Sequence, residues 1–331
     1  MDKTVKRLGI AQRLTPLGLL AAALLCPAAL LCSATAGAAG LTLPPAATEG
    51  LAVLYAGHPD KAIEQFRRIE MTRPDDPLGF LLEAEARWWQ IYCETCLIKW
   101  NMIDAWPQPR RSADDDYLVL TSKVTQLAEA RIAKSDSADM ELYAGLGWMQ
   151  RARLLALRND RRATAHAGVM GRECFLRSLE LDPQMADADT GLGIYNYYVD
   201  TLSGIAKVLR VFMGIPGGNK RDGIRQLRTG MEQGVLTRVT ARFYLAKNLR
   251  TFEQDYVGSI EVMKPLVAEY PQNPMFQLIL GDTQAKLNRR ELAEASFHAA
   301  ASAPVSGTAC GERVHMLVEQ SMAALGRGAD R

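Results

Sequence analysis

Apolar residues recur at helical spacing along most of this 331-residue chain, which is the pattern of helices that bury one face. A capping box at 112–115 predicts the start of one helix, whose inward positions are Tyr117, Leu120, Val124 and Leu127. A second helix is predicted over about 138–157, with inward positions Leu142, Leu146 and Met149. No stretch alternates between apolar and polar residues for long enough to predict a strand. We therefore expect an all-α fold.

A 34-residue period underlies this helical pattern. Near the start, a glycine, an alanine, an aromatic residue and a proline occupy relative positions 8, 20, 24 and 32 of one unit; they are Gly50, Ala62, Phe66 and Pro74. The first three recur at the same offsets near the end, as Gly281, Ala293 and Phe297. Weaker echoes are Ser259, Met263 and Pro271, and Gly171, Phe175 and Pro183. Small residues let paired helices approach closely, the aromatic residue fills the space to the next pair, and proline ends the second helix.

These motifs resemble the tetratricopeptide repeat family. The resemblance implies a right-handed superhelical solenoid of helix pairs that occupies residues 39–331. Its expected parts are clear repeats over about 43–76, 240–273 and 274–307, irregular repeats over 77–239 and a C-terminal capping helix over 308–326.

The period breaks in the middle of the chain. The interval from Ala62 to Gly171 exceeds three repeats by seven residues, and the interval from Gly171 to Ser259 exceeds two repeats by twenty. We place the larger insertion between Tyr195 and Gly223, where the apolar segment 202–213 precedes a glycine-rich turn. This turn and the Gly-x-x-x-Leu motif at Gly223 weakly resemble a eukaryotic tetratricopeptide-related family associated with inclusion-body clearance and lipid-droplet handling.

The charge balance bears on the class of partner. The chain carries 39 Lys and Arg residues against 37 Asp and Glu, and four of the basic residues lie within the first thirteen positions. The remainder is nearly neutral and lacks the concentrated basic surplus that binding to phosphates requires. We therefore expect no nucleic acid partner.

The N-terminus has the layout of a secretory signal peptide. Basic residues up to Arg13 precede an uncharged stretch from Leu14 to Gly40 that is rich in Leu and Ala and contains two Ala-x-Ala motifs within 34–38. This order predicts a signal peptide over 1–38 and export to the periplasm or beyond. Because the uncharged stretch is long enough to span a bilayer, the alternative is an uncleaved N-terminal membrane anchor.

A C-x-x-C motif at Cys93 and Cys96 is the one pattern that suggests catalysis. Such a pair acts as a thiol oxidoreductase when a strand and a βαβ unit surround it, whereas here it continues a helical run. We interpret both as structural cysteines, free or locally paired, with redox chemistry and a metal site as alternatives. Cys174 and Cys310 also remain in the mature chain, which is too few for a disulfide-dense scaffold.

Other candidate chemistry lacks its sequence context. The four histidines are scattered, the segment 217–221 lacks the rest of a phosphate-binding loop, and there is no G-x-S-x-G motif. Four tryptophans lie within 88–106; we expect most of them to pack in the core and Trp106 to be exposed. We predict no catalytic residue, no cofactor and no metal.

The family resemblance also implies which side chains face the concave groove. Family members present positions 2, 5, 9, 12 and 13 of each first helix, and the matching or nearby residues here are Tyr197, Tyr198, Tyr244, Asn248, Thr251, Leu278, Asp282 and Lys286. Members that grip a C-terminal carboxylate use Lys at position 5 and Asn at position 9. Asn248 fits, but Tyr244 stands in place of Lys, which argues against a carboxylate clamp.

We therefore predict an exported scaffold or adaptor that binds a protein or peptide partner in its concave groove and catalyses no reaction. Two alternatives stay open. The apolar segment 202–213 suggests peripheral membrane association, as in a membrane-associated assembly or lipid-handling factor. The Cys93–Cys96 motif suggests a thiol oxidoreductase.

Overall fold

The computed structural model describes residues 40–204, 207, 210–211, 214–304 and 308–329, all within one compact unit, Ala38–Arg331. The predicted signal peptide lies outside the described residues. The apolar segment 202–213 lies partly outside them.

The described part of the chain is predominantly helical, so the all-α expectation is confirmed. Its first elements are α1 (Pro45–Tyr55), α2 (Pro59–Thr72), α3 (Pro77–Thr95), β1 (Cys96–Lys99), β2 (Met102–Ala105), α4 (Ala113–Ile132), α5 (Ala138–Leu157) and α6 (Arg161–Leu181). The elements that follow are α7 (Ala186–Asp200), α9 (Lys220–Gln233), α10 (Arg238–Thr251), α11 (Tyr256–Glu269), α12 (Pro274–Lys286), α13 (Arg290–Ser302) and α14 (Thr308–Ala329). The helix predicted over 138–157 is α5.

Two details of the sequence interpretation were wrong. The chain contains a two-stranded antiparallel hairpin, β1–β2, in which Cys96 pairs with Ala105 and Lys99 with Met102. Its four-residue strands are too short to show alternation. At the start of α4, the Ser112 side chain makes no capping hydrogen bond; instead the Asp114 carboxylate accepts a 2.8 Å hydrogen bond from the Arg111 N–H.

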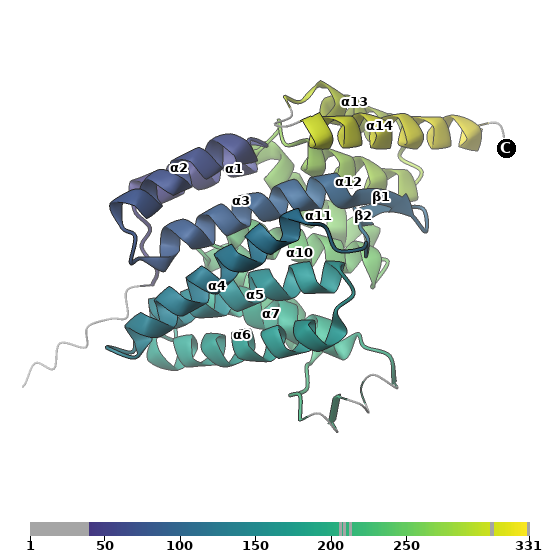
Figure 1. Cartoon of the computed structure of the whole chain (residues 1–331). Coiled ribbons are helices and arrows are strands. Elements are labelled where there is room, and N and C mark those ends of the chain that lie inside the picture. Colours follow the sequence, from purple (N-terminus) through teal and green to yellow (C-terminus); the bar gives the residue numbers. More distant parts are fainter. Residues whose placement is uncertain (1–39, 205–206, 208–209, 212–213, 305–307, 330–331) are drawn as a thin grey trace, which may run out of the picture. The chain divides into compact units, whose positions relative to one another are not determined.

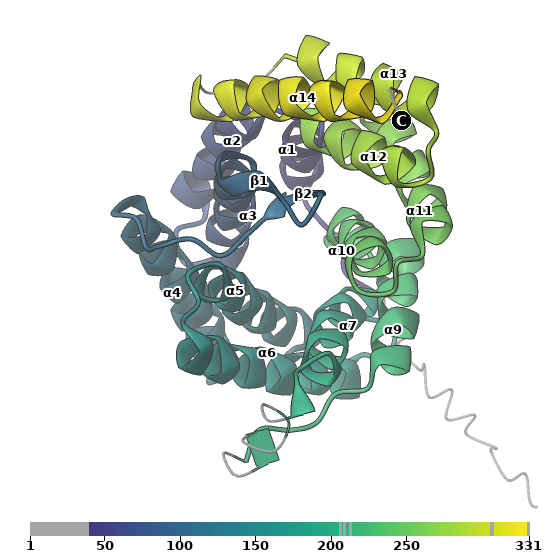
Figure 2. The same cartoon turned by 90° about the vertical axis from the view of Figure 1, so that its right-hand side faces the viewer.

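Consecutive helices pack side by side and form a ring (Figures 1 and 2). Figure 2 shows α3, α5, α7, α10 and α12 on the inside and α2, α4, α6, α9, α11 and α13 on the outside. The β1–β2 hairpin lies within the ring opening in this view. The ring therefore has an inner face that is lined by alternate helices and shared with the hairpin.

Four of the turns that lead from an inner to an outer helix share one backbone feature. Each contains one residue with a left-handed conformation: Gly57 (φ 98°), Asn159 (φ 59°), Gln254 (φ 55°) or Asn288 (φ 55°). Glycine and asparagine are the residues that adopt this conformation most easily. The connections after α3 and α7 are much longer, and the first of them contains the hairpin.

The two ends of the array meet. Asn273, just before α12, donates a 2.9 Å hydrogen bond from its side-chain amide to the Tyr55 carbonyl at the end of α1. The Tyr55 and Tyr270 ring centroids are 5.9 Å apart. Gly57 lies so close to Pro274 that a Cβ there would be 3.2 Å from the proline ring. This contact between the first and last parts of the array closes the ring.

Candidate functional site on the inner face of the ring

The eight residues that the repeat frame predicts to face the groove all lie on or at the end of the inner helices α7, α10 and α12. Three of them are completely buried: Tyr197, Asn248 and Leu278. Tyr244 and Asp282 are 9% and 8% exposed. The partly exposed ones are Tyr198, Thr251 and Lys286. Five of the eight side chains are therefore not free in an open groove, and the role of all eight in binding a partner stays a prediction.

Aromatic packing accounts for part of this burial. The Tyr198 ring makes edge contacts with Tyr197 and Tyr244, at centroid distances of 5.7 Å and 6.3 Å. Phe252, at the end of α10, contacts both Tyr197 and Tyr198. The Tyr197 hydroxyl donates a 2.6 Å hydrogen bond to the Glu253 carboxylate. The tyrosines therefore link α7 to α10 instead of offering free rings to a partner.

The hairpin packs against the inner face at α10 and α12. The Ile103 carbonyl accepts a 2.7 Å hydrogen bond from Arg250, and the Ile103 N–H donates to the Asp282 carboxylate at 3.3 Å. Arg250 also pairs with Asp282 at 3.0 Å, and its side chain is completely buried. An extended segment of the chain is thus held in the groove through both of its backbone groups, as a bound peptide would be.

A second set of contacts fixes Asp104, the residue that follows Ile103 on the hairpin. The Asp104 carboxylate accepts hydrogen bonds from Lys247 at 2.9 Å and from the Tyr92 hydroxyl at 3.0 Å. Burial acts to lower the pKa of Lys247, but the adjacent Asp104 carboxylate outweighs it, so the pKa is raised. Burial raises the pKa of Asp282, which Arg250 partly offsets. Burial also lowers the pKa of Lys286. The inner face therefore holds paired charges around the hairpin.

A second buried ionic cluster joins α3 and α5, and the Thr240 hydroxyl on α10 adds a 3.4 Å hydrogen bond to its Glu85 carboxylate. Glu85 and Arg153 form an ion pair at 2.5 Å, and the Trp89 indole N–H donates to Glu85 at 3.1 Å. The Arg153 guanidinium lies 4.6 Å from the centre of the Trp88 ring. The Gln150 amide donates a 3.0 Å hydrogen bond to the Leu81 carbonyl. These contacts stabilise the packing of inner helices that are distant in sequence.

A small cavity adjoins this cluster. Its volume is about 20 Å³, and its polar lining comes from Tyr55, Glu85, Gln150, Thr237 and Thr240. A cavity of this size accommodates about one water molecule and no organic ligand. The interior near Glu85 is thus filled by the protein's own side chains.

The cysteines pair differently from the sequence interpretation. Cys93, on α3, forms a disulfide with Cys310, on α14, at a Cα–Cα distance of 5.4 Å and a sequence separation of 217 residues. The interpretation of Cys93 and Cys96 as a local pair is therefore wrong. Cys96 is a free, buried thiol whose pKa is raised by burial and by Asp104. Cys174 is also free.

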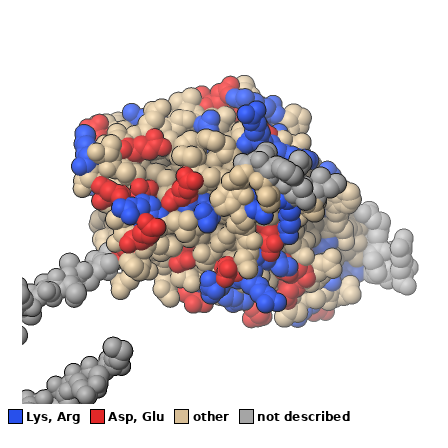
Figure 3. All heavy atoms as spheres, turned by 90° about the horizontal axis from the view of Figure 1, so that it is seen from below, with Lys and Arg blue, Asp and Glu red and all other residues tan. Residues whose placement is uncertain are grey.

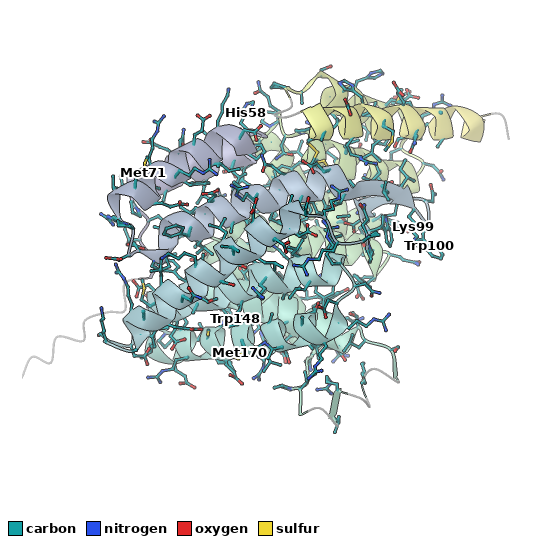
Figure 4. The ribbon with its side chains drawn as sticks, viewed as in Figure 1. His58, Met71, Lys99, Trp100, Trp148 and Met170 are labelled. Carbon is teal, nitrogen blue, oxygen red and sulfur yellow. A yellow bond between two sulfur atoms is a disulfide. The ribbon has the colours of Figure 1, made fainter. Side chains whose placement is uncertain are left out.

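The exposed tryptophan of the 88–106 stretch is Trp100, not Trp106. Trp88 and Trp89 are buried as predicted, and Trp106 is partly buried, donating to the Met102 carbonyl at 3.4 Å. Trp100 is 77% exposed at the hairpin turn, and the Lys99 ammonium lies 5.9 Å from the ring centres of both Trp100 and Trp106. Figure 4 shows Lys99 and Trp100 at the edge of the molecule.

Sequence reasoning missed the hairpin and the residues that hold it, chiefly Ile103, Asp104, Lys247 and Arg250. One local pattern points to the hairpin: Asn101 follows Trp100 between two apolar pairs, Leu97-Ile98 and Met102-Ile103. Trp100 and Asn101 both have positive φ, 54° and 57°, as a two-residue type I′ turn requires. The residues that grip the hairpin are distant in sequence, and no local pattern marks them.

Comparison with known proteins adds no identity: no protein-family model matches the chain, and no curated protein is significantly similar to it. In the described ranges, no helix is long and apolar enough to cross a bilayer. Among the same residues, His, Cys, Asp and Glu side chains do not gather in groups of three or more that could hold a metal ion. The structure itself therefore defines the class, a predominantly helical ring with a hairpin on its inner face.

Proposed function

We propose that this chain is an exported, tetratricopeptide-type scaffold that binds a protein partner and catalyses no reaction. The observation that carries the proposal is a recurring contact between a glycine on an inner helix and an aromatic ring on the next outer helix. A Cβ on Gly50 would overlap the Phe66 ring, and one on Gly281 would lie 2.8 Å from the Phe297 ring. Both pairs are sixteen residues apart, the spacing of positions 8 and 24 in the repeat.

The contact is also present in the middle of the chain, with longer helices. A Cβ on Gly145 would lie 2.7 Å from the Phe175 ring, although these two residues are thirty apart. Helices α5 and α6 have 20 and 21 residues, whereas α12 and α13 have 13 each. The extra length of this pair supports one repeat architecture with extended middle helices.

We assign the partner site to the rim of the inner face, beside the hairpin. Of the eight predicted residues, Tyr198, Thr251 and Lys286 keep accessible surface there. The Thr251 hydroxyl lies 3.4 Å from the Met102 sulfur on β2, so this rim and the hairpin are contiguous. A partner at this rim would contact both inner helices and hairpin, and protein–protein recognition is the function that suits such a mixed surface best.

Site-specific photo-crosslinking tests this assignment. A photoreactive residue is placed at Thr251 or Lys286 at the rim, and at Lys264 on the outer helix α11 as the control; all three are accessible. Crosslinks to one discrete protein from the rim positions alone are expected in the exported fraction. The intact mass of the same material gives the mature N-terminus, expected within about 37–40. Equal crosslinking from Lys264 would contradict the rim site, and a full-length mass in the cytoplasm would contradict export.

A further inference from the structure

The four cysteines that follow the predicted signal peptide are connected out of order. Cys93 is bonded to Cys310, whereas the free thiols Cys96 and Cys174 lie between them in the sequence. The disulfide of the ring therefore passes over two possible partners that are nearer to Cys93 along the chain. Something other than nearness in the sequence selects this pair.

Cys96 is the strongest competitor for Cys93 before the chain folds. It lies three residues from Cys93, whereas Cys310 lies 217 residues away. Short loops close at a lower entropic cost than long ones, so the unfolded chain brings Cys96 to Cys93 on the order of a hundredfold more often. An N-terminal signal also delivers Cys96 to the oxidising compartment long before Cys310. We therefore expect a Cys93–Cys96 disulfide to form first.

The folded structure uses the two cysteines of this motif for different contacts. Helix α3 ends at Thr95, and Cys96 then begins β1, where it pairs with Ala105. The Cys96 side chain is completely buried, and its thiol lies among the groups around the hairpin, whereas the Cys93 sulfur is bonded to α14. A Cys93–Cys96 bond would leave α14 without its covalent link to α3.

That link joins the two ends of the ring. Helix α14 packs against α12 and α13 from the end of the array and against α3 and β1 from its beginning. Figure 2 shows α14 along the top of the ring, above α1 and α12. Cys310 lies in its first turn, and Val314, Leu317 and Val318 bury its apolar face. Because Cys93 is only 2% exposed in the folded ring, any exchange at its sulfur has to precede the docking of α14.

The folded ring protects the native disulfide from the remaining thiols, since the attacking group in exchange is a thiolate. Burial and the Asp104 carboxylate raise the pKa of Cys96, and burial and the Glu141 carboxylate raise the pKa of Cys174 to about 12. Cys174 is also remote: its helix α6 lies at the bottom of Figure 1, and α14 at the top. Figure 3 views the molecule from that lower side, where charges of both signs are mixed.

We propose that this chain is a substrate of a thiol–disulfide isomerase, which converts an initial Cys93–Cys96 disulfide into the Cys93–Cys310 disulfide of the ring. The proposal rests on the export that is part of the proposed function, and it does not involve the partner site at the rim. Uncatalysed disulfide rearrangement takes minutes to hours. During that time α14 would lack its link to α3, so a catalyst of exchange is the partner that this pairing requires.

The exchange has two steps and no net oxidation or reduction. In the first, an isomerase thiolate attacks the Cys93 sulfur and forms a mixed disulfide, and Cys96 leaves as a thiolate that takes up a proton. In the second, Cys310 loses its proton and its thiolate attacks the Cys93 sulfur of the mixed disulfide, so that the isomerase thiolate leaves. Each step breaks one S–S bond and forms one.

Oxidative refolding tests the proposal. The exported chain is purified, reduced and unfolded in urea, then diluted into a glutathione redox buffer with or without protein disulfide isomerase. Samples are quenched by alkylation, and peptide mass mapping locates their disulfides. We expect Cys93–Cys96 to dominate the early species, and the isomerase should speed the appearance of Cys93–Cys310 about tenfold. Direct formation of Cys93–Cys310 without the early pair, or the same rate with and without isomerase, would overturn the proposal.

Cys96→Ala removes the competitor. Without isomerase, this variant should form Cys93–Cys310 about as fast as the parent chain does with it. Cys174→Ala makes the same substitution at the other free cysteine and should refold as the parent chain does. Equal rates for Cys96→Ala and the parent chain would also contradict the proposal. The two measurements on the parent chain need no variant, and far-UV circular dichroism verifies that each variant reaches the fold.

The refolding results and the test of export are separate. A refolding result against the exchange leaves export untouched, because export is judged by the intact mass and the location of the natively expressed chain. A full-length mass in the cytoplasm would contradict export, whatever the order in which the disulfides form in the refolding buffer.

Discussion

The terminal helix pairs and the pair α5–α6 in the middle of the ring share one kind of contact, a glycine packed against an aromatic ring. The helices that make this contact differ in length. In α1–α2 and in α12–α13, helices of 11 to 14 residues place the glycine and the aromatic residue sixteen positions apart. In α5–α6, helices of 20 and 21 residues place Gly145 and Phe175 thirty apart. The difference of fourteen is about four helical turns, shared between two helices. Whole turns can therefore be added without changing which faces meet.

The middle also differs in what it buries. The pairs α1–α2 and α12–α13 pack internally through apolar contacts such as Gly50 with Phe66, whereas the contacts between different pairs on the inner face bury ion pairs such as Glu85–Arg153 and Arg250–Asp282. Removing one partner of a buried ion pair strongly destabilises a fold, because the other charge stays buried and uncompensated. The two kinds of contact should therefore respond very differently to single substitutions.

The largest effect is expected from Arg250→Leu, on the inner face. It leaves Asp282 buried without its partner and removes the hydrogen bond to the Ile103 carbonyl, so the free energy of unfolding should fall by about 3–5 kcal/mol. Urea denaturation at constant pH measures this. Arg228→Leu, at an exposed position on the outer helix α9, is the control and should change stability by less than about 0.5 kcal/mol.

A double variant sharpens this first prediction. In Arg250→Leu with Asp282→Leu both charges are gone, and much of the lost stability should return. A double variant as unstable as Arg250→Leu alone would show that the hairpin contacts, not the uncompensated charge, dominate.

A smaller effect is expected in the terminal pair α12–α13. Ala293 is completely buried where α13 packs against α12, so Ala293→Leu should overpack this contact and destabilise the fold by about 1–3 kcal/mol. Ala295→Leu places the same side chain at an exposed position of the same helix and should be nearly neutral. Thermal unfolding compares them, and equal melting temperatures would contradict the repeat frame.

The smallest effect concerns pH at the junction of α2 and α3. Burial and the neighbouring Glu83 carboxylate raise the pKa of Glu70 to about 8 from its ordinary 4.5. Because the folded state holds this proton more tightly than the unfolded state, stability should fall as pH rises from about 4.5 to about 8. After allowance for its solvent exposure, the change should be on the order of 1 kcal/mol.

Glu70→Gln should remove this contribution to the pH dependence, and melting curves at pH 5 and pH 9 would reveal it. Glu64→Gln, at an exposed position of the same helix, serves as the control. If the Glu70→Gln and parent chains lose stability equally between the two pH values, Glu70 does not hold the proton in the fold.

The fold was predictable wherever contacts are local. Apolar spacing gives α5 over 138–157, and the glycine–aromatic motif locates α1–α2 and α12–α13, because helix pairing depends on residues close in sequence. The candidate site was predictable only in part. The repeat frame places Tyr244 and Asn248 on an inner helix, but the hairpin that Arg250 of the same helix holds through Ile103 lies 147 residues away in the sequence. The Cys93–Cys310 pair is equally non-local, and spacing alone favoured Cys96 as the neighbour.

The contact between Tyr55 and Asn273 has a consequence for how this protein can change in evolution and in design. An open solenoid can gain or lose a repeat at little cost, because each unit touches only its neighbours and a polar cap protects each end. Here the first and last pairs meet, so their contact surfaces are matched to one specific number of repeats between them. An inserted or deleted pair would separate Tyr55 from Asn273 and expose both. Longer or shorter helices within a pair should therefore be tolerated, as in α5–α6, whereas a change in the number of pairs should not be.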